Sequence, residues 1–357
     1  MNKKLIAVAV SAGLAMPCLA SAVEVAGKAL NIYGKAHISI DSVSAKDATG
    51  GSVSNMSISA NSSRLGFKGE GAVGSMTGFY LIEANVKTDE SGGNIDHRGA
   101  YVGLKGNGGS VLVGYKDTPY KGVRGKFDVF GDTVGDSRAI MGVTTTSAGY
   151  TDSFNVRAKN VLQYSIPKNG GFSADVMYST AYTGTADQGQ DNNDTSLISA
   201  DVTYKGGPLV FAAAYENHKL GTGNGNAKGT RLAAAYDMGA AKIGLMYEKI
   251  DTDNNAAASR ASYGVSAAIK AGAGKVKLQY VKAGDNDASS NSGANEVAVG
   301  YAMKLDKNAS TYIMYSKVSN DANAAYGING GHDSDKYTVG AAGQDVSAIS
   351  LGYIYKF

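Results

Sequence analysis

The stretch AISLGYIYKF, residues 348–357, alternates between two kinds of side chain. The residues on one parity are large and apolar, namely Ile349, Leu351, Tyr353, Tyr355 and Phe357. The residues between them are mostly small or polar. A period of two indicates a β-strand with two different faces. The apolar face therefore needs a core or lipid to contact, and the other face needs water or polar partners.

The same alternation recurs from Leu30 onward, in runs of about ten residues. In the first run, Leu30, Ile32 and Ile40 share one parity, whereas Asn31 and Lys35 lie on the other. The breaks between runs are alternately short, with Gly, Pro, Asn or Asp, and long and polar. Short turns at one end and long loops at the other indicate an up-and-down meander of about 16 strands.

A sheet of that length has to close or curl. A soluble β-sandwich or β-helix would bury the apolar parity in a protein core. Tyrosines recur near the ends of the runs, which is typical of the aromatic girdles of a membrane barrel. Because a closed barrel satisfies every backbone group in lipid, we predict an all-β fold, a 16-stranded antiparallel transmembrane β-barrel with long external loops. A barrel of about 16 strands holds water in its lumen.

The first 22 residues have the features of a secretory signal peptide. Lys3 and Lys4 precede an apolar run over residues 5–14, and Ala20-Ser21-Ala22 forms a small-residue cleavage site. We predict a signal peptide over residues 1–22 and a barrel domain over residues 23–357. Cleavage removes the single cysteine, Cys18, so the exported protein holds its fold without a disulfide.

The charge of the chain excludes some classes of partner. The formal net charge is +3, and losing Lys3 and Lys4 leaves about +1. A nucleic-acid footprint needs a clear basic excess, so nucleic acid is not an expected partner. The four histidines are His37, His97, His218 and His332, and they lie far apart without metal-ligand spacing. We therefore expect neither a metal nor a cofactor.

One segment breaks the alternation, KDTPYKGVRGKFDVFGDTVGDSRAIMG, residues 116–142. It mixes basic and acidic side chains with apolar groups such as Phe127, Phe130 and Ile140. A plain external loop would not need so many anchoring apolar groups. We predict that this third long loop folds into the lumen and narrows it, the alternative being a packed surface loop.

In several places the sequence resembles the general porins of Gram-negative outer membranes, the trimeric general-diffusion kind. The matching segments are IYGKA (32–36), RLGFKGE (64–70), Arg98 followed by YVGL (101–104), TPY (118–120) and the terminal Phe357. The resemblance covers essentially the whole chain after the signal peptide. It departs from the enteric members in lacking a Pro-Glu-Phe segment in the loop, and in having Tyr115 where many relatives have arginine.

The resemblance implies a pore constriction in which loop carboxylates face a ladder of basic residues on the opposite wall. Matched residue by residue, the ladder is Lys35, Arg64, Arg98 and Arg157, and the acidic side is Asp128, Asp132 and Asp136. Facing rows of charge set ion preference in a channel. Basic and acidic groups nearly balance here, so the sequence leaves the preference for anions or cations open.

These features predict a passive outer-membrane channel for ions and small hydrophilic solutes rather than an enzyme. The alternatives are an outer-membrane barrel with a hydrolase role, or a structural or adhesive barrel with a plugged lumen. By resemblance, the partners are two further copies in a homotrimer, with residues 88–96 as the latch, and outer-membrane lipid and lipopolysaccharide. We also expect the last run to pair with residues 30–40 and to close the barrel.

Overall fold

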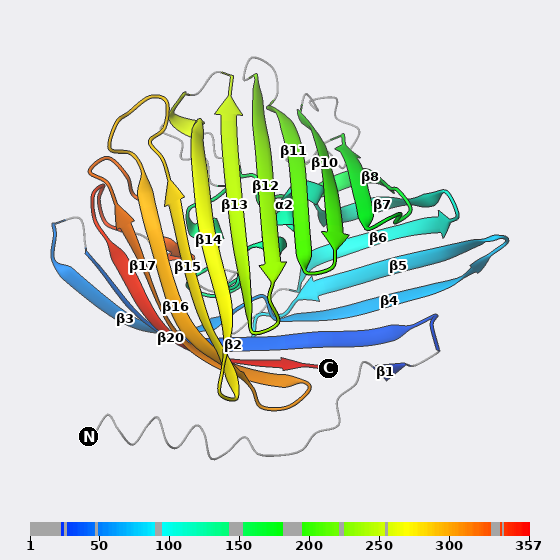
Figure 1. The fold of residues 1–357 in the computed structure, drawn as a ribbon, viewed down its shortest axis with the longest axis horizontal. Coiled ribbons are helices and arrows are strands. Elements are labelled where there is room, and N and C mark those ends of the chain that lie inside the picture. Colours follow the sequence, from blue (N-terminus) through cyan, green and yellow to red (C-terminus); the bar gives the residue numbers. More distant parts are fainter. Residues whose placement is uncertain are drawn as a thin grey trace.

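A computed structural model describes residues 23–24, 27–46, 49–89, 95–142, 153–180, 195–220, 225–253, 256–329, 336–337 and 339–357. The predicted signal peptide and most of the predicted latch, residues 90–94, lie outside the described residues. The described residues form a ring of antiparallel strands that surrounds a few short helices (Figure 1).

Strand β2 (Asn31–Lys46) pairs with β20 (Val346–Lys356) and closes the ring. Within the described residues, 16 strands make up this barrel when β3 (Ser52–Ala60) and β4 (Arg64–Val73) are taken as one interrupted strand. This confirms the predicted closed barrel and the predicted pairing of its last and first runs. The other barrel strands are β5 (Met76–Asn85), β6 (Asp96–Gly106), β7 (Gly109–Asp117), β8 (Arg157–Ser165), β9 (Phe172–Ser179), β10 (Thr195–Gly206), β11 (Leu209–Leu220), β12 (Asn226–Asp237), β13 (Ala241–Thr252), β14 (Arg260–Ala271), β15 (Gly274–Ala283), β16 (Ala294–Lys304) and β17 (Ala309–Asn320).

Short elements lie at the edge of the ring or in its loops. They are β1 (Val23–Glu24), which pairs with β2, the pair β18 (Ile328–Asn329) and β19 (Lys336–Tyr337), the helix α2 (Pro119–Val123), and the 3-10 turns η1 (Arg124–Lys126), η2 (Ser137–Ala139) and η4 (Ala256–Ala258). Across the described residues, each helix is too short or too polar to cross a membrane.

The two faces of the barrel wall differ as the alternation predicts. On β13, Leu245 and Tyr247 are exposed on the outer face at 55% and 43%. Met246 and Glu248 between them are buried on the inner face. The apolar parity therefore forms the outer surface of the ring, where the predicted barrel contacts lipid.

The segment after β7 packs against the inner face of the wall. Helix α2 contacts β10, β11 and β12, and in Figure 1 it lies within the ring of strands. Glycines on the inner face make room for the aromatic side chains of the segment after β7. A Cβ at Gly264 would come 2.6 Å from the Phe127 ring, and one at Gly300 would come 3.1 Å from the Phe130 ring. The largest buried apolar cluster of the described chain lies at this contact.

Candidate constriction site

Three predicted basic residues lie side by side on the inner face. Lys35 on β2 stands opposite Arg64 at the start of β4 in the strand register. Arg64 and Arg98 of β6 share the Glu83 carboxylate on β5, at nitrogen–oxygen distances of 3.6 Å and 2.9 Å. Arg98 also donates to the Asn85 side-chain oxygen over 3.0 Å. Glu83 therefore joins Arg64 and Arg98 across three strands, next to Lys35.

The fourth predicted basic residue, Arg157, extends this group toward the start of the loop. Its Nε lies 2.9 Å from Asp117 Oδ1, and Lys121 Nζ lies 2.9 Å from the same oxygen. Arg157 is also close enough to Arg98 for the two charges to repel. We call Lys35, Arg64, Arg98 and Arg157 the basic wall.

Asp132 reaches from the loop to the basic wall. Its carboxylate lies 3.0 Å from Lys35 Nζ and 3.8 Å from Arg64, and it accepts a hydrogen bond from Ser62 Oγ over 3.2 Å. The Asp132 backbone has a φ of 60°, a left-handed conformation that Asp tolerates better than most residues. This turn lets its N–H donate to Asp136 Oδ2 over 2.8 Å, so the loop itself fixes the position of the carboxylate.

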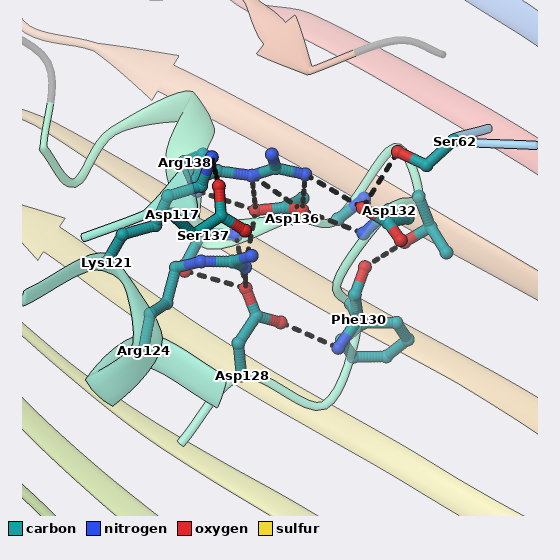
Figure 2. A network of polar contacts seen from close by, with 12 residues as sticks. Ser62, Asp117, Lys121, Arg124, Asp128, Phe130, Asp132, Asp136, Ser137 and Arg138 are labelled. Atoms are coloured by element: carbon teal, nitrogen blue, oxygen red, sulfur yellow. Dashed lines mark hydrogen bonds and ion pairs between the residues drawn. The ribbon is translucent and has the colours of Figure 1, made fainter. Parts of the chain in front are cut away.

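Asp128 and Asp136 lie inside the loop and pair with the loop's own arginines (Figure 2). Their side chains are 1% and 0% exposed. Arg124 contacts both carboxylates, and Arg138 contacts Asp136 and, at 3.2 Å, Asp132. Burial acts to raise the pKa of Asp136, but the charges of Arg124 and Arg138 outweigh it and hold that pKa below its usual range. The Asp136 carboxylate therefore stays charged, and it braces the turn that presents Asp132.

A family model for Gram-negative porins matches residues 7–324 of the chain. The chain belongs to the Gram-negative porin family. This membership confirms the predicted outer-membrane location and the predicted passive channel, and it favours a channel over an enzyme.

Individual relatives agree with the family assignment. This porin is 29% identical to outer membrane porin protein 32 of Delftia acidovorans, over 100% of both chains. Its fold is similar to that of an anion-selective porin from Comamonas acidovorans, with a TM-score of 0.75 and 23% identity over 92% of this chain and 99% of that one. It is also similar to the trimer form of OmpT from Vibrio cholerae, with a TM-score of 0.63 and 19% identity over 91% and 99% of the two chains.

The residues of the barrel wall that anchor the loop were not identified from the sequence. Arg231 on β12 and Glu248 on β13 form a buried ion pair, with an Nε–Oε2 distance of 3.0 Å. Glu248 also accepts hydrogen bonds from the Tyr120 hydroxyl over 3.0 Å and from the Gly142 N–H over 2.6 Å. Arg231 donates to the Tyr120 carbonyl over 3.1 Å. One ion pair of the wall thus anchors both ends of the loop.

Further anchors follow along β14 and β15. Ser266 donates to the Phe127 carbonyl over 2.7 Å, and Lys277 donates to the Val129 carbonyl over 2.7 Å. Gln279 accepts from the Val129 N–H and donates to the Gly135 carbonyl, over 3.2 Å and 2.9 Å. These side chains lie on the polar parity of their strands, and that parity was the sequence signal that could have identified them. Among the described residues, no cluster of three or more His, Cys, Asp or Glu side chains is placed to hold a metal ion.

Proposed function

We propose that this porin conducts ions and small hydrophilic solutes through a constriction between the loop, residues 116–142, and the basic wall. The proposal rests on the contact of Asp132 with Lys35 and Arg64. This contact joins the loop to the wall at β2 and β4, whereas the residues that anchor the loop lie on β12 to β15. All seven predicted residues belong to this constriction, with Asp128 and Asp136 as its internal support. Opposed charges across such a gap select among ions without any catalytic step, and we propose no catalytic role.

We further propose that the constriction prefers anions. In the described part of the chain, its ion pairs comprise seven cations, namely Lys35, Arg64, Arg98, Lys121, Arg124, Arg138 and Arg157, against the five carboxylates of Glu83, Asp117, Asp128, Asp132 and Asp136. The excess of two positive charges favours anions at the narrowest point. The similar fold of a porin described as anion-selective supports this preference.

The proposed partners are two further copies in a homotrimer, outer-membrane lipid and lipopolysaccharide. The trimer form of a protein of similar fold supports the trimer. The outward-facing apolar parity, with Leu245 and Tyr247 as examples, supports the contact with lipid. The proposed latch between subunits is the segment over residues 88–96.

Conductance across a planar bilayer tests this function. Refolded protein in potassium chloride should give step openings in multiples of three. Under a salt gradient, the reversal potential should have the sign of anion preference. A silent membrane would argue against the channel, and cation preference would argue against the charge assignment.

The ion preference should weaken as the pH rises from 7 to 9. Burial lowers the pKa of Lys121 to about 8 even though Asp117 opposes the shift, so its ammonium group loses its proton within this range. Deprotonation removes one positive charge beside Arg157, which reduces the preference for anions. Reversal potentials at both pH values measure the change.

The Lys121→Gln variant provides the control for this pH effect, because it has no ammonium group to titrate. Its preference at pH 7 should resemble that of the wild type at pH 9, and its own pH step should be smaller. An unchanged pH step in the variant would exclude Lys121 as a source of the effect.

A further inference from the structure

A group of aromatic and apolar side chains lies on the inner face of the barrel beside the basic wall. It consists of Tyr33, Phe79, Leu81 and Tyr101, which we call the aromatic patch. Tyr33 donates its hydroxyl to Glu83 over 2.7 Å, the same carboxylate that pairs with Arg98, so its ring faces the lumen. Each side chain of the patch is partly exposed.

The register of β5 and β6 places the rest of the patch on that face. Phe79 and Leu81 share the parity of Glu83, and Leu81 stands opposite Tyr101. The rings of Phe79 and Tyr101 meet edge to face, with 6.4 Å between centroids. Tyr33, Leu81 and Tyr101 lie between the basic wall and the short turns. Tyr33 is two residues before Lys35, toward the start of β2, and Tyr101 is three residues after Arg98, toward the turn between β6 and β7.

Cationic side chains border the aromatic patch. The Lys68 amine lies 5.0 Å from the centroid of the Tyr33 ring. Lys28 and Lys68 line a cavity of about 360 Å³ together with Phe79, Leu81 and Tyr101. Glu70 also lines this cavity, and its carboxylate is paired with Lys105 at 2.5 Å. With Glu70 neutralised in this way, the cavity presents a positive charge next to aromatic rings.

Apolar surface that faces a water-filled lumen is unfavourable, and covering it favours binding. A solute with a flat apolar body would cover that surface and would add favourable contacts between rings. A carboxylate on the same solute would pair with Lys68 or Lys28. We propose that the aromatic patch binds small aromatic carboxylates of about the size of benzoate, which reach it through the channel past the basic wall. This proposal rests on the proposed channel function.

Block of single-channel chloride current tests the proposal. In planar bilayers with potassium chloride, sodium benzoate is added and compared with sodium acetate and sodium cyclohexanecarboxylate. We expect benzoate to reduce the chloride current at concentrations about tenfold lower than acetate does, with cyclohexanecarboxylate between them. The Phe79→Ala/Tyr101→Ala variant should lose most of this difference, and Lys68→Gln should weaken block by benzoate several-fold.

Phe211→Ala is the matched control, because it removes an aromatic ring from the outer face, where Phe211 is 43% exposed. It should leave block by benzoate unchanged. Equal block by benzoate and acetate in the wild type, or wild-type block in the double variant, would overturn the aromatic patch. Equal block by benzoate and cyclohexanecarboxylate would overturn its preference for aromatic solutes. Chloride steps in every variant would show that the channel function is intact. A failure of the aromatic patch can therefore be distinguished from a failure of the proposed channel.

Discussion

Replacing Arg231 with methionine is expected to release the constriction loop from the wall and to lower the stability of the barrel by about 3–5 kcal/mol. Arg231 and Glu248 are both 0% exposed. Without the guanidinium, the Glu248 carboxylate keeps a buried charge that a tyrosine hydroxyl and one backbone N–H cannot compensate. The Tyr120 carbonyl also loses its donor.

Two measurements follow this change. Urea unfolding in detergent should show the loss of stability, and single-channel recordings should show a larger and noisier conductance, because the loop no longer keeps one position. Lys228→Met is the control on the same strand, since it breaks an exposed pair with Asp253 whose side chains are 42% and 37% exposed. Solvent screens an exposed pair, which therefore contributes little to stability, so this variant should stay near wild type.

The double variant Arg231→Met/Glu248→Met separates the buried charge from the volume of the side chains. Replacing both members of a buried ion pair with apolar groups is often neutral, because no uncompensated charge is left. We therefore expect the double variant to recover much of the stability that Arg231→Met loses. A double variant as unstable as the single one would show that packing, and not the buried charge, dominates this anchor.

The barrel itself could be predicted from the sequence because its signal is local. Each strand alternates with a period of two, and each turn carries residues that favour turns. The interruption between β3 and β4 was not identified from the sequence, although Asn61, Ser62 and Ser63 there are residues that favour turns. It depends on tertiary contacts of Asn61 and Ser63 with the backbone of His37, over 2.8 Å and 2.9 Å.

The contacts of the proposed constriction were predictable only in part, because ion pairs depend on how a loop turns. The resemblance to the general porins implied that Lys35 and Arg64 face Asp132, and the structure brings them into contact. Asp128 and Asp136 were expected to face the basic wall as well. The left-handed turn at Asp132 instead directs them toward Arg124 and Arg138, four and two residues away. A string of charged residues does not show which of them a turn will pair.

Neutralising Asp132 and removing Arg98 are expected to shift the ion preference in opposite directions. Asp132→Asn removes a carboxylate that is 23% exposed at the wall, and this raises the excess of positive charge and the preference for anions. Arg98→Ala removes a cation, and this loss lowers the preference for anions. Glu83 then keeps Arg64 and the Tyr33 hydroxyl as partners. A unit charge at about 4 Å in water contributes about 1 kcal/mol, so each permeability ratio should change about two- to fivefold.

Reversal potentials under a gradient of potassium chloride measure both shifts, and they should shrink in molar salt, where exposed charges are screened. Asp253→Asn is the control for Asp132→Asn, because it makes the same chemical change at an exposed pair with Lys228. That variant should keep the wild-type reversal potential. If Asp132→Asn and Arg98→Ala also kept it, these side chains would not line the narrowest part of the pore. A shift of both variants in the same direction would mean that the loop had moved, since charge alone requires opposite signs.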